Sequence, residues 1–446
     1  MEEVTQVLTA REERTNRQRA LLERYHMPVI SFSMNIPDSV KDSPLIRRAF
    51  LTGREALRAA LDEACIKVLR KEEILAATGC EYLCAVKSDA LTVKKLCVQI
   101  EDANALGRLF DMDVLSPDGE KIDREAAGVG ERSCIVCGAA GESCASRRVH
   151  SAEELQEAAR RIMTEHYSVA DRQDVAEKVN AALLEELYTT PKPGLVDRSN
   201  NGSHRDMTVL TLEASAKALK PFWAKCMEIG QETAEKAPEE TFALLREAGK
   251  AAERDMYAAT NGVNTHKGTI FTLGVICGAI GRLWKAETPY SDVETITREC
   301  ARMTSEAMEK DFAAMSKATA RTTGERVYLD YGLRGVRGEM ANGLLSVKNV
   351  ALPMIHEARS AGYNTNRAGV YALLALIARG RDTNMIARGG KEKADAASKW
   401  AEELLYYCDF PPLTAVEVLN RKFIAENLSP GGCADLLAAA FFLDSL

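Results

Sequence analysis

Residues 241–259 read T-F-A-L-L-R-E-A-G-K-A-A-E-R-D-M-Y-A-A, and apolar side chains recur in this run every three or four positions. That spacing places them on one face of an α-helix. The same periodicity is found over residues 293–318, 391–407 and 413–427, and runs typical of β-strands nearly vanish after about Ser168. We therefore predict that the second half of the chain is all-α.

The first half of the chain has a different sequence pattern. Short runs that favour β-strands are separated there by helical stretches. The strand-like runs are residues 28–34, 81–86, 93–100 and 109–115, and the helical stretches include residues 5–23 and 47–69. This mixture predicts a compact α+β domain.

The length of 446 residues is enough for about two or three domains of ordinary size. The sequence pattern changes from mixed α+β to helical between Arg161 and Asp174, after a charged helix that begins at Ala152. No run of Pro, Gly or Ser marks a linker there. We therefore expect a multidomain chain whose parts are in fixed contact or joined by a continuous helix. The expected domains are residues 1–166 and 167–446.

Charge and composition narrow the classes of function. The net charge of −7 argues against a general nucleic-acid binder, which needs many cations to neutralise phosphates. The chain has no run of about 18 apolar residues and starts with an acidic segment, so we expect no membrane span, no signal peptide and a cytoplasmic location. The twelve scattered cysteines are expected to be reduced thiols rather than a disulfide framework.

The loop at residues 189–207, T-T-P-K-P-G-L-V-D-R-S-N-N-G-S-H-R-D-M, differs from the helical sequence around it. Prolines on both sides of Lys192 keep the backbone extended, and Gly194 and Gly202 allow a ligand to approach it closely. The cations Lys192, Arg198 and Arg205 would then be presented along a fixed loop. We expect this loop to bind a small anionic molecule that carries phosphate.

Four more stretches place polar residues at the beginning of a helix. In residues 262–274, G-V-N-T-H-K-G-T-I-F-T-L-G, the polar side chains precede an apolar helix whose free N–H groups favour an anion such as a triphosphate. The candidate residues are Asn264, His266 and Lys267 here, Arg334, Arg337 and Glu339 in residues 331–340, Asp382, Asn384 and Arg388 in residues 382–390, and Asp435 in residues 429–435. A single such stretch is often only a helix cap, but five in one helical domain are not expected to be caps alone.

A pair of carboxylates stands out in the first half, at residues 107–115, G-R-L-F-D-M-D-V-L. Asp111 and Asp113 are two residues apart on a predicted strand, so both side chains project from the same face. Mg²⁺ with phosphate oxygens completing its shell would relieve their repulsion, and Gly107 and Arg108 could approach the phosphates. The alternative is that two surface acids lie at a solvated strand end.

A cysteine cluster follows this strand. Cys134, Cys137, Cys144 and His150 have the residue types of a tetrahedral Zn²⁺ site, although their spacing is not that of a standard zinc finger. Free thiols near a glycine-rich turn are the alternative.

Five motifs of the first half form a set. They are R-x-x-R-x-x-R-Q at residues 11–18, N-I-P at 35–37 with Lys41, T-G-x-E at 78–81, G-R-L-F-D-M-D-V at 107–114, and R-S-C-I-V-C…C-A-S-R-R-V-H-S at 132–151. Together they resemble the apo-citrate lyase phosphoribosyl-dephospho-CoA transferase family over about residues 5–165. Asp38 follows N-I-P where the family pattern has glycine, which leaves the role of that loop open.

This resemblance implies a nucleotidyltransferase-like domain. The family transfers the prosthetic group of citrate lyase from its triphosphate precursor to a serine of the acyl carrier subunit and releases pyrophosphate. Transfer of a phosphorylated group is consistent with a metal ion bound by Asp111 and Asp113, so both residues are catalytic candidates. Arg108 is a candidate for binding the substrate.

The motifs of the second half form another set. They are T-P-K-P-G-L-V-D-R…N-G-S-H-R-D-M, N-T-H-K-G, G-L-R-G-V-R-G-E, D-T-N…R-G-G and S-P-G-G-C-A-D-L-L-A. Over about residues 175–446 they closely resemble triphosphoribosyl-dephospho-CoA synthase. In that family the 2′-hydroxyl of 3′-dephospho-CoA displaces adenine from ATP at C1 of the ribose. Its product is the substrate of the first half, so each resemblance supports the other.

That reaction needs residues that bind the triphosphate, a base for the incoming hydroxyl, and a negative group near the oxocarbenium-like centre. For phosphate and substrate binding we predict Lys192, Arg198, Asn264, His266, Lys267, Arg334, Arg337, Arg388 and Asp435. For Mg²⁺ we predict some of Asp197, Asp206 and Asp382. Asp206 and Glu339 are the candidates for the general base and for the negative group that stabilises the oxocarbenium-like centre. His204 is expected to bind the ribose or a phosphate. Alternatively, Glu339 only pairs with Arg337, and His204 is a loop histidine with its hydrogen bonds satisfied.

The sequence therefore favours a bifunctional transferase that builds and attaches the citrate lyase prosthetic group. Its expected partners are ATP, 3′-dephospho-CoA and the acyl carrier subunit, without nucleic acid or membrane, and the sequence is compatible with a homo-oligomer. Two alternatives remain: an all-helical nucleotide or ADP-ribose hydrolase, and a non-catalytic zinc-containing scaffold that binds nucleotides.

Overall fold

The computed structural model describes the chain at residues 2–36, 42–139, 144, 147, 149–318 and 320–446. Pro37, Asp38 and Lys41, which belong to or flank the N-I-P motif, lie outside the described residues. The chain forms two compact units, residues 1–170 with 286–288, and residues 171–285 with 289–446. Helix α5, Ala152–Tyr188, runs without interruption through the point where the first unit passes into the second.

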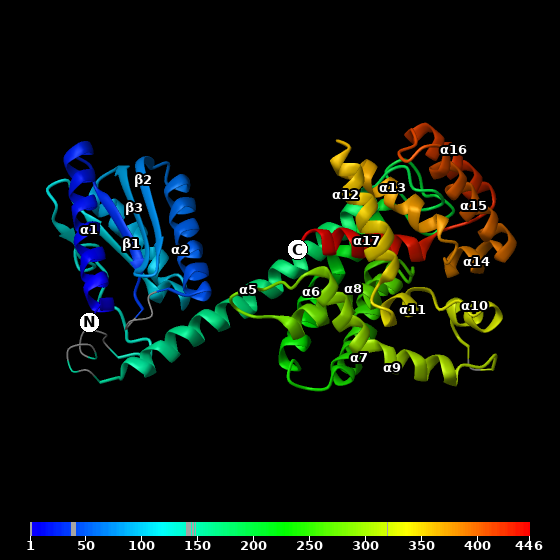
Figure 1. Ribbon diagram of the computed structural model, residues 1–446, viewed down its shortest axis with the longest axis horizontal. Coiled ribbons are helices and arrows are strands. Elements are labelled where there is room, and N and C mark those ends of the chain that lie inside the picture. Colours follow the sequence, from blue (N-terminus) through cyan, green and yellow to red (C-terminus); the bar gives the residue numbers. More distant parts are fainter. Residues whose placement is uncertain (1, 37–41, 140–143, 145–146, 148, 319) are drawn as a thin grey trace. The chain divides into compact units, whose positions relative to one another are not determined.

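The first unit contains a five-stranded antiparallel sheet in the order β2-β3-β1-β4-β5 (Figure 1). Its strands are β1 Val29–Met34, β2 Lys67–Ala76, β3 Gly79–Lys87, β4 Phe110–Leu115 and β5 Lys121–Ile122. Its helices are α1 Glu2–Tyr25, α2 Pro44–Glu63, α3 Ala90–Asp102 and a short 3₁₀ helix, Leu106–Leu109. This arrangement confirms the α+β prediction for the described residues.

Helices cover both faces of this sheet. On one face, Leu21 and Leu22 of α1 pack with Val29, Leu83 and Ala85 in a small apolar cluster. On the other face, the ring of Phe32 stacks on that of Phe50 in α2, with ring centroids 5.0 Å apart. The sheet is therefore the middle layer between α1 and α2, as Figure 1 shows.

Two of the expected element boundaries are wrong. Residues 93–100 are not a strand but part of α3, because the buried positions Val93, Cys97 and Val98 follow helical spacing and Asp89 caps the helix by accepting the backbone N–H of Thr92. The helix expected over residues 47–69 ends at Glu63.

Cys65 explains that early end. It adopts a left-handed φ of 54°, and the backbone N–H of Ile66 returns to the carbonyl of Leu61, which closes the last turn of α2. Strand β2 then begins at Lys67, a strand that the periodicity did not indicate.

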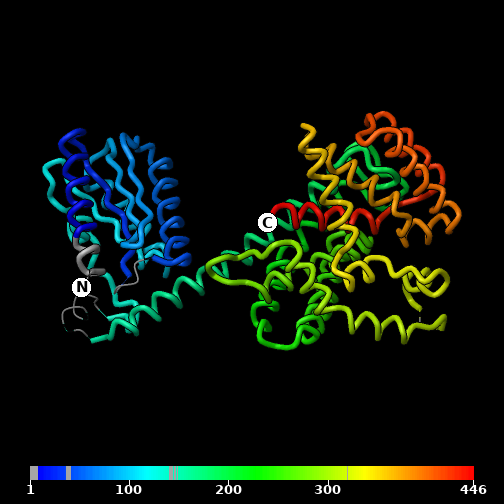
Figure 2. Tube along the Cα trace, viewed as in Figure 1, coloured from blue at the N-terminus to red at the C-terminus, as the bar shows by residue number. Residues whose placement is uncertain are grey.

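The second unit is built from helices, and no strand occurs among its described residues (Figure 2). After α5 come α6 Val209–Glu232, α7 Pro238–Ala259, α8 Lys267–Leu283, α9 Val293–Ala314, α10 Thr323–Tyr331 and α11 Gly335–Ala341. A π-helical turn, Val347–Ala351, precedes α12 Leu352–Ser360, α13 Thr365–Ala378, α14 Thr383–Gly389, α15 Lys391–Tyr407, α16 Leu413–Ala425 and α17 Gly431–Asp444. The all-α prediction is confirmed.

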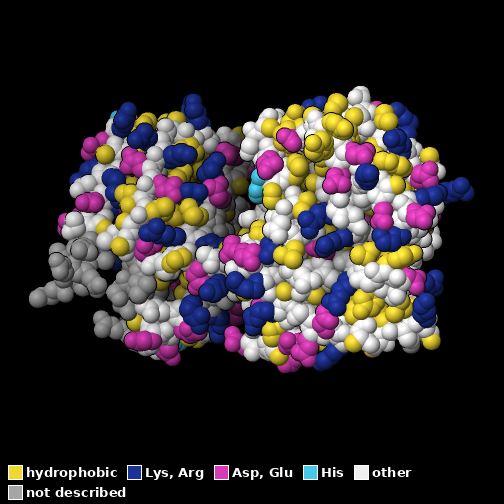
Figure 3. Space-filling model, turned by 45° about the vertical axis from the view of Figure 1, so that its right-hand side comes forward, with side chains coloured by type: hydrophobic (Ala, Val, Ile, Leu, Met, Phe, Trp, Pro, Cys, Tyr) yellow, Lys and Arg dark blue, Asp and Glu magenta, His cyan; other side chains and the backbone are white. Residues whose placement is uncertain are grey.

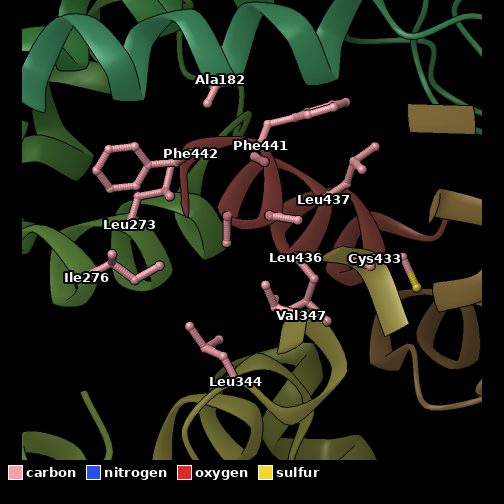
Figure 4. Close-up of a cluster of buried hydrophobic side chains, with 14 of the residues drawn as sticks. Ala182, Leu273, Ile276, Leu344, Val347, Cys433, Leu436, Leu437, Phe441 and Phe442 are labelled. Carbon is pink, nitrogen blue, oxygen red and sulfur yellow. The ribbon is translucent and has the colours of Figure 1, made fainter. Parts of the chain in front are cut away.

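Helix α17 lies in the core of this unit. Between Asp435 in its first turn and Asp444 at its end, its side chains are apolar on all sides, and Phe441, Phe442 and Leu437 are buried. Figure 4 shows them among residues of α5, α8 and the turn around Val347. Burial of a helix on every side fixes its position. The polar first turn of α17 is thereby held at a defined point in the helical unit.

Among the described residues, no helix has both the length and the apolar composition needed to span a membrane. On the face seen in Figure 3, basic and acidic side chains are mixed over the surface.

Candidate functional sites

Four of the five loop-to-helix stretches of the helical unit meet the fifth, residues 429–435 at the first turn of α17, which we call the α17 turn. The contacts are His204 Nε2 to Ser429 Oγ (2.8 Å), the backbone N–H of Cys433 to Asp382 (2.8 Å), Gly268 against the carboxylate of Asp435, and Glu339 in the cavity wall that Gly432 also lines. Stretches that are up to 246 positions apart in the sequence (435 minus 189) therefore form one site.

The buried carboxylate of Asp197 holds the 189–207 loop in shape. Its Oδ2 accepts the backbone N–H of Lys192 at 2.9 Å, and its Oδ1 accepts two further backbone N–H groups at 2.7 and 3.0 Å. Gly194 has a φ of 73°, and a Cβ atom there would lie 2.1 Å from the carbonyl oxygen of Leu428, so the close approach requires glycine. Asp197, a predicted Mg²⁺ ligand, has backbone partners for both oxygens.

Two predicted phosphate-binding cations differ in their surroundings. Lys192 is buried, and its Nζ donates to Glu186 at 2.6 Å to the carboxylate and 2.8 Å to the backbone carbonyl. Its charge is therefore already compensated. Arg198 is exposed, and its guanidinium stacks over the ring of Tyr188 with 4.2 Å to the centroid.

One ring nitrogen of His204 has no hydrogen-bond partner among the described residues. This nitrogen is the buried Nδ1, which lies 4.0 Å from Oδ1 of the exposed Asp206, whereas Nε2 is used by Ser429. Burial lowers the pKa of His204, Arg388 lowers it further, and Asp206 opposes both effects. Arg388 itself donates to the backbone carbonyl of Ser203 and to the side chain of Asn427.

His266 and Lys267 lie at the N-terminus of α8, as expected. His266 Nδ1 is 2.7 Å from Ser215 Oγ. Burial lowers the pKa of His266 to about 4, and the charge of Lys192 acts in the same direction. The imidazole is thus neutral at pH 7 and can meet a phosphate only through hydrogen bonds. Lys267 forms a 2.8 Å ion pair with a glutamate of α7, and Asn264 is exposed.

The carboxyl group of Asp435 has a raised pKa. Its Oδ1 accepts a 2.5 Å hydrogen bond from Thr269 Oγ1 of α8. Burial raises the pKa of Asp435 to about 7, with Glu186 and Asp382 raising it as well and the Thr269 hydrogen bond opposing them. A carboxyl group with this pKa can exchange a proton near neutral pH.

A cavity of about 390 Å³ opens beside the α17 turn, and its walls combine acids with arginines. Both carboxylate oxygens of Glu339 accept hydrogen bonds from Ser346, at 2.6 Å from the hydroxyl and 2.9 Å from the backbone. Arg379 and Arg381 also line this cavity, and neither has an ion-pair partner among the described residues. Two uncompensated cations beside Glu339 suit an anionic ligand.

The other predicted groups around this cavity have protein partners. Arg334 pairs with Glu309, and Arg337 lies 3.6 Å from Glu325 rather than on Glu339. Asp382 caps α14 through its Oδ1 and receives Cys433 on Oδ2, and burial raises its pKa. Asn384 lies in the first turn of α14, against Gly431.

The first unit contains a second cavity, of about 1600 Å³, with Asp111 and Asp113 in its wall. The alternating burial of β4 places both carboxylates on the same face, away from buried Met112. Asp113 pairs with Lys121 at 2.7 Å, and Arg132 lies 3.9 Å from Asp111. Partial burial raises the pKa of Asp111, and the neighbouring Asp113 raises it further.

Strand register connects this acid pair to the basic α1. Glu81, Ser33 and Asp111 lie opposite one another across β3, β1 and β4, so their side chains share a face. Arg14 and Arg17 of α1 pair with Glu81, and burial raises the pKa of that carboxyl. Two motifs far apart in sequence thus belong to one surface.

Arg108 bonds to the segment that precedes the cysteine cluster. Its guanidinium donates to the hydroxyl of Ser133 at 2.7 Å and to the Ser133 carbonyl. The ligand atoms of Cys134, Cys137, Cys144 and His150 all lie within 4.8 Å of one another. The predicted metal-ligand set is therefore assembled in space.

Sequence reasoning did not single out six cations that line these cavities, among them Lys121, Arg132, Arg379 and Arg381; the other two are Lys94 and Arg124. Arg132 begins the R-S-C-I-V-C motif, and Arg379-Gly-Arg381 directly precedes Asp382, so a local signal existed for these three arginines. Lys121 lies on a two-residue strand and has no such signal.

The chain is a two-part transferase, because its two units match two families of transferases. Residues 172–446 match the family model described as CitG, ATP:dephospho-CoA triphosphoribosyl transferase, and residues 2–166 match CitX, apo-citrate lyase phosphoribosyl-dephospho-CoA transferase. The chain belongs to the family of CitXG proteins, in which both activities are joined.

Two relatives match this chain over nearly its whole length and theirs. The chain is 33% identical to Protein CitXG of Haemophilus influenzae, covering 98% of this chain and 94% of the relative, and 32% identical to Protein CitXG of Leuconostoc mesenteroides, covering 99% and 96%. A probable 2-(5''-triphosphoribosyl)-3'-dephosphocoenzyme-A synthase of Vibrio cholerae is 40% identical over 59% of this chain and 85% of its own length. The second unit is thus the synthase, and the first transfers the prosthetic group to apo-citrate lyase.

Proposed function

We propose that the α17 turn is the point at which ribose chemistry takes place, with the triphosphate of ATP in the adjoining cavity of about 390 Å³. Arg379 and Arg381 bind the triphosphate, helped by Arg334, because two of these three guanidinium groups have no other partner among the described residues. The convergence of the other four motif stretches on this turn is the observation that supports the proposal best.

In this proposal Asp435 is the general base. The 2′-hydroxyl of 3′-dephospho-CoA gives its proton to the carboxylate, and its oxygen forms the new bond to C1 of the ribose. The N-glycosidic bond breaks, its electron pair leaves with adenine, and adenine takes up a proton from water while Asp435 returns its proton to water. A pKa of about 7 suits a group that must accept a proton near neutral pH.

Glu339 would face the positive charge that develops at C1. Its two hydrogen bonds from Ser346 fix the carboxylate at the cavity wall, and a fixed negative group stabilises an oxocarbenium-like centre. His204 and Asp206, at 4.0 Å, would bind a ribose hydroxyl through the free Nδ1 of the histidine. Asp206 remains the second candidate for the base.

For the first unit we propose that Asp111 and Asp113 bind Mg²⁺. Two carboxylates on one strand face are hard oxygen ligands, and a divalent cation would offset their mutual repulsion, which together with burial raises the pKa of Asp111. When bound, Mg²⁺ would neutralise charge on the phosphates. Arg108 and Arg132 would hold the triphosphate precursor while a serine hydroxyl of the acyl carrier subunit attacks the phosphorus and pyrophosphate leaves.

One experiment tests both parts. The chain is incubated with ATP, 3′-dephospho-CoA and the apo acyl carrier subunit, and adenine and the mass of the carrier are measured. We expect adenine release that requires 3′-dephospho-CoA and a carrier serine that gains the prosthetic group. Adenine release with water alone would contradict the transfer proposal, and an unmodified carrier with accumulated triphosphoribosyl-dephospho-CoA would contradict the proposal for the first unit only.

A further inference from the structure

We infer that Cys134, Cys137, Cys144 and His150 bind one Zn²⁺ ion, and that this ion fixes the cavity wall that positions Arg108. The effect on Arg108 rests on the proposed function of the first unit. The binding of zinc does not, because it is measured independently of any activity.

The distances among these side chains fit a shared metal ion. Sγ of Cys137 lies 3.5 Å from Sγ of Cys144 and 3.3 Å from Nε2 of His150. Zn–S bonds of about 2.3 Å and Zn–N bonds of about 2.0 Å in a tetrahedron separate neighbouring ligand atoms by roughly 3.5 Å. A disulfide would need an S–S distance of about 2.05 Å.

The backbone around Cys134 forms a tight turn that brings the cysteines together. The N–H of Gly138 donates to the carbonyl of Cys134 at 3.0 Å, and Gly138 has a left-handed φ of 73°. The N–H of Val136 donates to Cys134 Sγ at 3.4 Å. A backbone N–H directed at sulfur stabilises a thiolate, which is the form that binds metal.

His150 has the surroundings of a metal ligand. While Nε2 faces Cys137, Nδ1 lies 4.0 Å from the carboxylate of Glu154. Histidine ligands usually have a carboxylate next to the ring nitrogen that does not bind the metal, since it orients the ring. Glu154 is itself fixed, because it accepts the backbone N–H of Ser151 at 2.8 Å while Ser151 Oγ accepts the N–H of Glu154.

The cluster therefore joins two parts of the first unit. Ser151 and Glu154 form a reciprocal cap at the start of α5. At the other end, Cys134 follows Ser133, which receives the guanidinium of Arg108. Three of the four proposed ligands, Cys134, Cys144 and His150, also line the cavity that contains Asp111. An ion in the cluster would thus hold Ser133, and with it Arg108, in place.

The primary test is the metal content of the full chain, purified without chelators and measured by mass spectrometry for metals. We expect one zinc per chain. Replacement by Co²⁺ should produce the visible bands of a tetrahedral ion and a thiolate-to-cobalt charge-transfer band in the near ultraviolet. The inference would be overturned if the chain bound no zinc after reconstitution. It would also be overturned if peptide mapping of protein purified in reducing buffer found a disulfide between Cys137 and Cys144.

Variants locate the ion and its effect. Cys137→Ser and His150→Ala each remove one of four ligands and should lower the zinc content of the purified chain, whereas Cys65→Ser and Cys408→Ser, which change exposed cysteines outside the cluster, should not. The ligand variants should lose carrier modification but still form triphosphoribosyl-dephospho-CoA, which reports that the second unit is folded. Unchanged zinc content would overturn the site, and unchanged carrier modification in zinc-free variants would overturn the role in positioning Arg108.

Discussion

The carboxylate of Asp435 packs against the backbone of Gly268, so closely that a Cβ atom on residue 268 would lie 2.0 Å from Oδ2. Glycine at the start of α8 therefore sets the position of the proposed base. Gly268→Ala should displace Asp435 and lower triphosphoribosyl-dephospho-CoA formation by about 100-fold, since a misplacement of about 1 Å can cost that much.

The matched control is Gly324→Ala in α10, where a Cβ atom would meet nothing within 4 Å. It should leave synthesis unchanged. Carrier modification from ready-made triphosphoribosyl-dephospho-CoA should be normal in both variants. Full synthase activity in Gly268→Ala would show that the position of Asp435 is not critical.

The pKa of Asp435, about 7, predicts a pH dependence of synthesis. A base must be deprotonated, so the rate should rise as the pH increases through about 7 and then level off. Asp435→Asn should lower the rate by about 10²–10⁴-fold and remove this rise. A rise that persists in Asp435→Asn would assign it to another group, with Asp206→Asn as the next variant to measure.

The same pKa affects stability. The folded chain holds the Asp435 proton more tightly than the unfolded chain, whose pKa is near the ordinary 3.8. The free energy of unfolding of the wild type, relative to Asp435→Asn, should therefore fall as the pH rises from about 4 to about 7 and change little above that. Denaturant titrations at several pH values measure the difference.

Arg379 and Arg381 should determine the affinity for ATP. Changing either to Gln removes a charged hydrogen-bond donor, so KM for ATP should rise by roughly 10- to 100-fold, from about 1.5–3 kcal/mol per charged hydrogen bond. Arg421→Gln, at an exposed arginine of α16, is the control. Equal KM values in all three variants would place the triphosphate elsewhere.

The carboxylate pair of β4 is tested by Asp111→Asn and Asp113→Asn. Each should abolish Mg²⁺-dependent carrier modification and leave adenine release intact, because the synthase residues lie in the other unit. Asp118→Asn, at an exposed aspartate after the strand, should behave as wild type. Isothermal titration with Mg²⁺ and pyrophosphate gives a readout without turnover, and unchanged affinity would remove the metal from Asp111 and Asp113.

Local sequence patterns predicted part of this molecule and not the rest. The two-residue spacing of Asp111 and Asp113 was enough to place them on one face, because that periodicity is a property of the strand alone. The contact of Asp382 with Cys433, 51 positions later, depends on the packing of α14 and α17 and has no local signal. The β-branched residues of α3 favoured a strand locally, but burial on a helical face decided its structure.

Lys192 illustrates why the motif alone did not define the role of each residue. Its sequence neighbours indicated a phosphate ligand, but in the structure Nζ is buried against Glu186. Lys192→Met should destabilise the chain by about 3–5 kcal/mol, because it leaves the carboxylate of Glu186, whose side chain is only 12% exposed, without its ion-pair partner. The double change Lys192→Met with Glu186→Leu should recover most of that stability. If KM for ATP also returns to near the wild-type value in the double variant, Lys192 is an internal ion-pair partner; a KM that stays raised at restored stability would make it a phosphate ligand.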